Sequence, residues 1–133
     1  MPLLNFMPQF VEPIRAGRKR HTIRARRTIP VKVGDQLYLY TGLRHKGAQR
    51  ILPGAVTCTR TQTIRIQSEV TNLVVDIDGQ VLDVDECARL AVADGFPDFT
   101  AFHAFWERVH GDKAGQVHFT GQIIHWKNPK ATN

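Results

Sequence analysis

Hydrophobic and polar positions in the first half of the chain predict short strands around one early helix. Leu3–Phe6 is an apolar run of strand length. Pro8 suits the first turn of the helix that follows, because its missing N–H has no helical partner there. Pro13 should shorten or distort this helix, and Gly17 is typical of its end. Further strands are predicted at 20–25, at 36–40 and, as one or two strands, at 55–67.

The second half of the chain predicts a hairpin, two helices and a closing strand. Asp78-Gly79 separates the hydrophobic runs 73–77 and 81–82, a pattern typical of a tight hairpin. Apolar residues then recur at helical spacing in two segments. The candidate N-caps are Asp83 or Asp85 for the first helix and Asp98 or Thr100 for the second. The two helices should end at Gly95 and Gly111. The last strand is predicted at 116–126, with a bulge at Gly121.

Strands on both sides of a helical pair indicate an α+β fold, with a closed or half-closed barrel as the expected architecture. The length of 133 residues matches one compact domain. We therefore expect a single domain over 1–126. It should have an N-terminal helix and a helical pair before the last strand, followed by a flexible tail over 127–133.

The distribution of charge adds a possible partner to this picture. The net charge is +6, and residues 1–65 hold 13 of the 18 lysines and arginines but only two acids. Residues 15–27 carry seven of these cations and no acid. Clustered cations attract anions, of which phosphate is the commonest. The alternative is a solvated basic face that only aids solubility.

Other patterns limit the function classes. Two cysteines are too few for a disulfide framework, no signal-peptide pattern opens the chain, and no apolar run reaches the roughly 20 residues of a membrane span. We therefore expect a cytoplasmic protein with no membrane partner. The histidines lack zinc-ligand spacing, and no nucleotide-binding glycine motif or serine-hydrolase elbow occurs. We expect no metal and no cofactor.

The segment after Gly17 carries the chemistry. Side chains alternate along a strand, so Arg20, Thr22 and Arg24 should share one face. A bend at the helix end can bring the Lys19 ammonium to the same space. An ammonium, a hydroxyl and a guanidinium together would form an anion or carbonyl site. The competing interpretation is an edge strand protected by cations.

Gly17-x-Lys19-x-x-Thr22-x-Arg24 matches the G-x-K-x-x-T-x-R signature of ASCH domains, and the chain resembles this family over most of its length. The other segments that resemble the family are Phe10-Val11-Glu12-Pro13-Ile14, Val33-Gly34-Asp35-Gln36-Leu37, Ala93-Asp94-Gly95-Phe96 and Phe119-x-Gly121-x-x-Ile124-His125-Trp126. The closing strand resembles that of phage-type members, which would imply a bacteriophage origin and a bacterial host cytoplasm.

The resemblance implies a PUA-like small β-barrel of about five to seven strands with a cleft beside the first helix. Family members are associated with RNA binding, and some small bacterial members hydrolyse N4-acetylcytidine with a Lys, a Thr and a Glu. The matching residues here would be Lys19, Thr22 and, as the acid, Asp94. Asp is one methylene shorter than Glu, which puts the amidase activity in doubt more than the pocket.

Asp94 has its own sequence argument. It falls on the same helical face as Cys87, Leu90 and Ala91, which should point inward. A carboxylate on an inward face needs a partner, and Lys19 is the candidate. The alternative is ordinary exposure at a frayed helix end.

These observations leave three hypotheses. The first is a monomeric module that binds RNA, single-stranded nucleic acid or a modified nucleoside. The second is an amidohydrolase acting on N4-acylcytidine-type substrates with Lys19, Thr22 and Asp94 as catalytic residues. The third is a ribonuclease that uses the basic cleft. The candidate ligand-binding residues are Arg18, Arg20, Arg24, Tyr40, Arg44 and Lys46, the last two on a long loop over 41–54.

Overall fold

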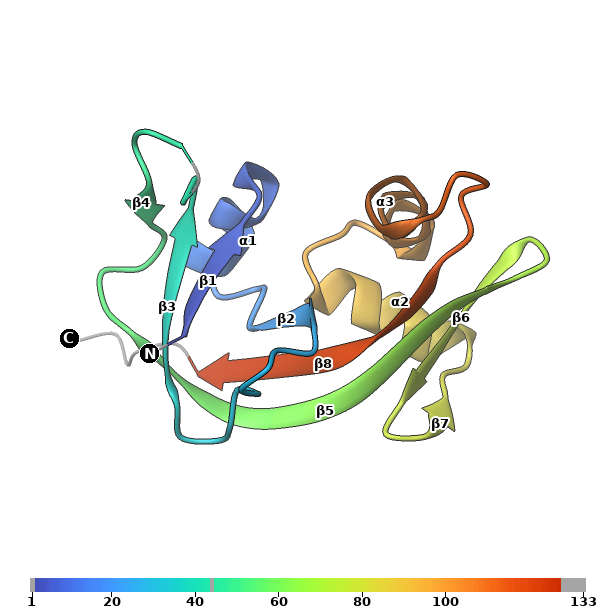
Figure 1. Ribbon diagram of the computed structural model, residues 1–133, viewed down its shortest axis with the longest axis horizontal. Coiled ribbons are helices and arrows are strands. Elements are labelled where there is room, and N and C mark those ends of the chain that lie inside the picture. Colours follow the sequence, from blue (N-terminus) through green and yellow to red (C-terminus); the bar gives the residue numbers. More distant parts are fainter. Residues whose placement is uncertain (1, 44, 128–133) are drawn as a thin grey trace.

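The computed structural model describes residues 2–43 and 45–127 and contains three α-helices and eight strands (Figure 1). The predicted tail lies outside the described residues, except Lys127, which ends the last strand. The elements are β1 (Leu3–Phe6), the 3-10 helix η1 (Pro8–Phe10), α1 (Val11–Arg15), β2 (His21–Ala25), β3 (Gln36–Thr41), β4 (Gln49–Arg50), β5 (Val56–Glu69), β6 (Asn72–Ile77), β7 (Gln80–Val81), α2 (Val84–Ala93), α3 (Phe99–His110) and β8 (His118–Lys127).

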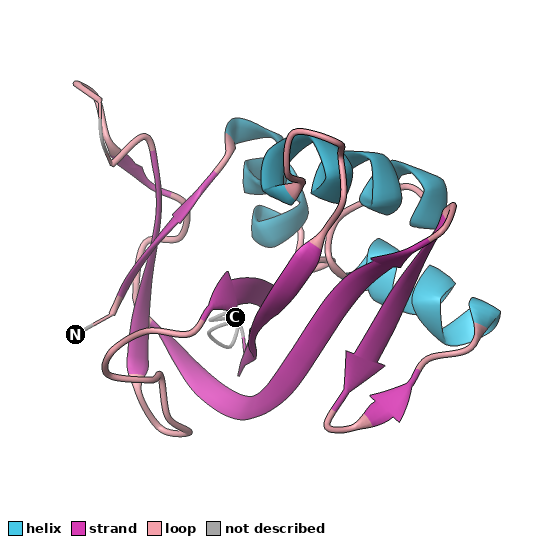
Figure 2. Ribbon diagram, turned by 45° about the vertical axis from the view of Figure 1, so that its right-hand side comes forward, coloured by secondary structure: helices cyan, strands magenta, loops and turns pink. Residues whose placement is uncertain are grey.

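One long, bent strand organises the mixed sheet. β5 runs for 14 residues and pairs antiparallel with β3 at its start, β8 along most of its length and β6 at its end. β1 joins β3 in parallel, and β2 joins β8 antiparallel. The curvature of β5 gives the sheet the shape of a trough (Figure 2). β1 and β2 are both edge strands of this sheet.

The α+β class is confirmed, but the sheet does not close into the predicted small β-barrel of five to seven strands. The sheet has eight strands, and within the described residues β2 pairs only with β8 and β1 only with β3. No ladder of backbone hydrogen bonds therefore joins these two edges. Arg24 spans the gap instead, because its Nη2 donates to the backbone oxygen of Asn5 at 2.6 Å.

Local signals set the helix boundaries. Asp83 caps α2 in a reciprocal capping box with Glu86, and Asp98 caps α3. α2 and α3 pack over the part of the sheet formed by β5, β6 and β8 (Figure 1). Trp106 of α3 meets Phe119 of β8 with ring centroids 4.7 Å apart. The helical pair thus forms one side of the hydrophobic core. No helix of the described ranges has the length and apolar character to cross a membrane.

The bulge lies in a different strand from the predicted one. Gly121 pairs regularly with Ala25, and the register shifts in β5 between Cys58 and Arg60. Gly121 is required for another reason: a Cβ there would lie 2.3 Å from the backbone oxygen of Arg24. A glycine in a strand marks either a bulge or a close approach of backbone, and here it is the second.

Candidate functional site

Lys19 reaches the interior because the chain turns sharply after α1. Gly17 adopts φ +78°, a conformation that glycine takes without strain. The backbone N–H groups of Arg18 and Lys19 both donate to the carbonyl of Pro13 at 3.0 Å. This turn directs the chain into β2 and leaves Lys19 only 2% exposed. The bend predicted at the helix end is therefore present.

Asp94 is the C-cap residue of α2, at the start of a Schellman motif. Gly95 N–H donates to Val92 and Phe96 N–H to Ala91, while Gly95 takes φ +100°. A Cβ on Gly95 would lie 3.1 Å from the Phe10 ring and 3.3 Å from Lys19 Cδ. This close packing places the helix end directly against the Lys19 side chain.

Lys19 and Asp94 form a buried ion pair, as the sequence predicted. The Lys19 Nζ donates to Asp94 Oδ1 at 2.7 Å and to the Asp94 backbone oxygen at 2.7 Å. It therefore neutralises the carboxylate and caps the negative end of the helix dipole. The same ammonium lies 4.7 Å from the centroid of the Phe10 ring.

Burial and pairing oppose each other in the pKa values of this pair. Burial lowers the pKa of the Lys19 amine below its ordinary value, although Asp94 acts in the other direction. Burial alone would raise the pKa of the Asp94 carboxyl, but Lys19 and His21 outweigh it and hold that pKa below its ordinary value. Asp94 is therefore ionised at neutral pH.

Thr22 and Arg24 lie on the same face of β2, as predicted from strand alternation. Thr22 is 5% exposed, and its Oγ1 accepts a hydrogen bond from Arg24 Nε at 3.0 Å. A hydroxyl that accepts from Arg24 keeps its own hydrogen free for another acceptor. The guanidinium lies over the Phe6 ring at 4.7 Å, and burial lowers the pKa of Arg24 to about 10.

These side chains converge on one small cavity of about 200 Å³ between β1, β2, α2 and α3. Trp106 lines it as well, and its Nε1 has no hydrogen-bond partner among the described residues. The cavity therefore combines charged donors and an acceptor with an apolar wall. Its polar lining includes Lys19, Thr22, Arg24 and Asp94, and its aromatic lining Phe6, Phe10, Phe105, Trp106 and His110.

The other candidate residues lie elsewhere. Arg20 precedes β2, so strand alternation does not extend to it, and it does not share the face of Thr22 and Arg24; it lines a separate groove. Arg18 is exposed and pairs with Glu12. Neither Tyr40, whose hydroxyl accepts from Arg50, nor the exposed Lys46 lines the cavity. Arg44 lies outside the described residues.

Sequence reasoning missed the contribution of His21. Its Nε2 lies 3.1 Å from Asp94 Oδ1, at contact distance though not in hydrogen-bond geometry. The ring also packs edge-on against His125 of β8, with centroids 5.4 Å apart. Only the pairing of β2 with β8 reveals this contact, because the two histidines are remote in the sequence. Phe105 and Trp106, on the apolar face of α3, also line the cavity.

The arrangement can bind a small planar ligand with both donor and acceptor groups. Within the described residues no cluster of His, Cys, Asp and Glu has the form of a metal site. No protein-family model, curated protein or solved structure significantly matches this chain.

Proposed function

We propose that this chain is an ASCH-type, PUA-like module that binds RNA or a nucleoside-type ligand, with a nucleobase in the cavity around Lys19. The observation that carries the proposal is the meeting of Lys19, Thr22, Arg24 and Asp94, from two remote segments, at a single cavity. The PUA-like part of the proposal rests on the sequence resemblance, since the curved sheet does not close into a barrel (Figure 2).

A nucleobase edge matches the polar lining. Asp94 accepts from an exocyclic amine, whereas Thr22 and Arg24 donate to a carbonyl oxygen or a ring nitrogen. Cytosine carries both kinds of group side by side. The aromatic rings that line the cavity give the base an apolar surface.

The size of the cavity selects a base rather than a whole nucleotide. Ligand pockets for larger molecules run to about 300–1,000 Å³, and this cavity holds about 200 Å³. A single ring with a small substituent fits such a volume. The sugar and any phosphate therefore remain outside the cavity.

The test is binding of cytidine, N4-acetylcytidine and a short single-stranded RNA, measured by calorimetry. Asp94→Asn and Lys19→Met should each weaken binding by about tenfold or more: the first removes a charge-assisted hydrogen bond of about 1.5–3 kcal/mol to the base, and the second removes the cation that holds the Asp94 carboxylate in place. Asp85→Asn and Lys113→Met, both at exposed positions away from the cavity, are the matched controls. Binding that is equally strong in all four variants, each shown by circular dichroism to be folded, would contradict the proposal.

A second candidate is hydrolysis of an N4-acylcytidine. The observation in its favour is an amine with a lowered pKa, buried beside a hydroxyl and a carboxylate. For a catalytic step, Lys19 would have to take the Thr22 proton. Both Lys19 hydrogen bonds go to Asp94 instead, and Thr22 accepts from Arg24. Binding without turnover is therefore the better-supported function.

Turnover separates the two candidates. The protein is incubated with N4-acetylcytidine, and free cytidine is followed by chromatography. The binding proposal expects no cytidine above a blank without protein. Release of cytidine that disappears in Lys19→Met and in Thr22→Val would replace it with the hydrolase.

A further inference from the structure

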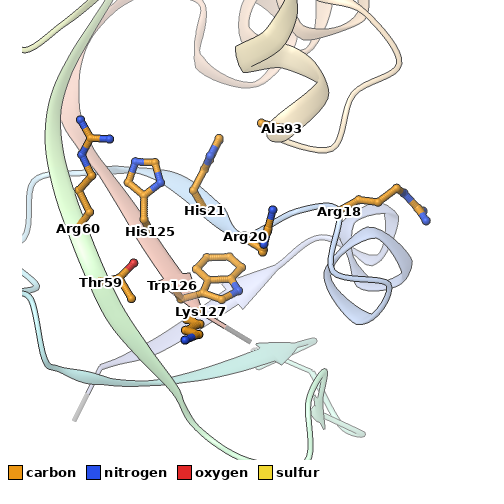
Figure 3. A pocket seen from close by; sticks show the side chains of 9 residues that line it. All are labelled: Arg18, Arg20, His21, Thr59, Arg60, Ala93, His125, Trp126 and Lys127. Carbon is orange, nitrogen blue, oxygen red and sulfur yellow. The ribbon is translucent and has the colours of Figure 1, made fainter. Parts of the chain in front are cut away.

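A second, larger hollow lies apart from the base cavity. It is an open groove of about 580 Å³ that shares no lining residue with the cavity. Figure 3 shows Arg60, His125 and His21 standing side by side, with Ala93 at the end of α2 facing them. The lining contains no acid: it consists of Arg18, Arg20, His21, Thr59, Arg60, Ala93, His125, Trp126 and Lys127.

Strand pairing creates a row of three nitrogen-bearing side chains across the groove. His125 of β8 is in register with His21 of β2 on one side and with Arg60 of β5 on the other. Residues in register point to the same face of a sheet. The row therefore holds a guanidinium and two imidazoles on neighbouring strands.

The bulge in β5 is what brings Arg60 into this row. Cys58 pairs with Trp126, and Arg60, two residues later, pairs with the adjacent His125. Strict alternation would put Arg60 on the buried face of Cys58. Because Thr59 is an extra residue, Arg60 lies on the opposite face of the strand. It therefore lines the groove, as Thr59 also does. Bulges that redirect a side chain in this way are frequent next to binding sites.

The positive charge of the groove lacks compensation. Arg20, Arg60 and Lys127 form no ion pair with any acid in the described ranges, and all three are exposed. Arg18 pairs with Glu12 and points away from the row (Figure 3). Like charges held together by the fold attract a multivalent anion.

We propose that this groove is a phosphate-binding site, with Arg60, Arg20 and Lys127 as the charged donors and Thr59 as a neutral one. The planar fork of an arginine matches the oxygens of a phosphate, which makes arginine a preferred phosphate ligand. The volume suits a phosphorylated ligand or a short piece of nucleic-acid backbone. The site shares no lining residue with the base cavity and extends the proposed function to a second point of contact.

Binding of inorganic pyrophosphate, measured by calorimetry at low salt, is the direct test. Arg60→Gln should weaken it by about tenfold, because a charge-assisted hydrogen bond and a nearby charge are lost. Arg65→Gln is the matched control, since Arg65 lies on the same strand, is exposed and does not line the groove. Equal affinity of the two variants, or no binding by wild type, would overturn the proposal.

The pKa of His125 is a second measurement, and it would not change if the groove residues had only a structural role. Burial first, then His21 and Arg60, lower the pKa of His125 to about 4. An anion in the groove stabilises the protonated ring, so pyrophosphate should raise this pKa in an NMR titration. Unchanged titration at saturating pyrophosphate would place the anion elsewhere and refute the assignment.

Two further arms separate the sources of phosphate and the two sites. Cytidine monophosphate and a short single-stranded RNA are compared with pyrophosphate, and a preference for RNA identifies a backbone. Asp94→Asn should weaken cytidine binding but should not weaken pyrophosphate binding, because it removes a negative charge beside His21 and no lining residue of the groove. The groove proposal can therefore be refuted while the base-cavity proposal stands, and the reverse.

Discussion

The Lys19–Asp94 pair places two charged side chains where proteins usually bury apolar ones. Both side chains are at most 7% exposed, at a place where apolar side chains would pack without a desolvation cost. A buried ion pair often adds little net stability, because desolvation offsets the attraction between the charges. A pair that lines a cavity is better explained by what it offers to a ligand. This argument supports a binding role for both residues.

Removing one charge of the pair should lower the unfolding free energy more than its share of the loss when both charges are removed. Lys19→Met leaves a buried carboxylate without its cation, a change worth about 3–5 kcal/mol. We expect Lys19→Met/Asp94→Leu to be less destabilised than the sum of the two single variants. Urea unfolding of the four proteins gives this coupling energy. Additive losses would show that the two charges do not depend on each other.

The pair also makes stability depend on acid pH. The pKa of Asp94 is lower in the folded protein than its ordinary value of 3.8. Its contribution is therefore fully present above about pH 4 and is lost as pH falls through the folded-state value. The difference in unfolding free energy between wild type and Asp94→Asn should shrink as the pH falls below the ordinary value of 3.8. A difference that stays constant in urea titrations over this range would contradict the ion pair.

At the scale of elements, the parts of the site that depend on neighbouring residues were predictable. The cap at Asp83, the turn at Gly17 and the helix end at Gly95 are local signals, and each stands where expected. The bulge was misplaced, because its cause lies in the pairing of β5 with β8 and not in one residue type. The contact between His21 and Asp94 was missed because the two residues are remote in the sequence and meet only through the packing of α2 against β2.

Gly95 tests how tightly the helix end holds the site. Gly95→Ala forces a Cβ against Phe10 and Lys19 and strains a backbone at φ +100°. Gly34→Ala, at φ +94° with open space around it, carries the strain alone. A left-handed conformation costs a non-glycine residue about 1–2 kcal/mol. Thermal unfolding should show a larger loss for Gly95→Ala, and only this variant should weaken cytidine binding. Equal effects would mean that the contact with Lys19 is unimportant.

For the whole molecule, the long bent strand determines what the sequence could not predict. The curvature of β5 separates the two sheet edges, and Arg24 bridges them where a barrel would have a ladder. The same strand carries Arg60 to one end of the row of histidines. Neither arrangement follows from residue periodicity, since both depend on which strands are neighbours. The asymmetric charge, in contrast, was visible in the sequence and gathers partly around the groove.

The two proposed contacts predict different responses to salt. Each phosphate contact with a single strand releases counterions, so the slope of log affinity against log salt changes by about 0.7 per contact. Arg60→Gln should therefore flatten this slope for single-stranded RNA. Asp94 is proposed to contact an uncharged base, so Asp94→Asn should lower the affinity at every salt concentration and leave the slope unchanged. Fluorescence anisotropy between about 50 and 200 mM salt measures both, with Arg65→Gln as control. A slope that is the same in wild type and Arg60→Gln would remove the groove from the RNA-binding surface, because a cation that contacts phosphate cannot be lost without changing the number of counterions released.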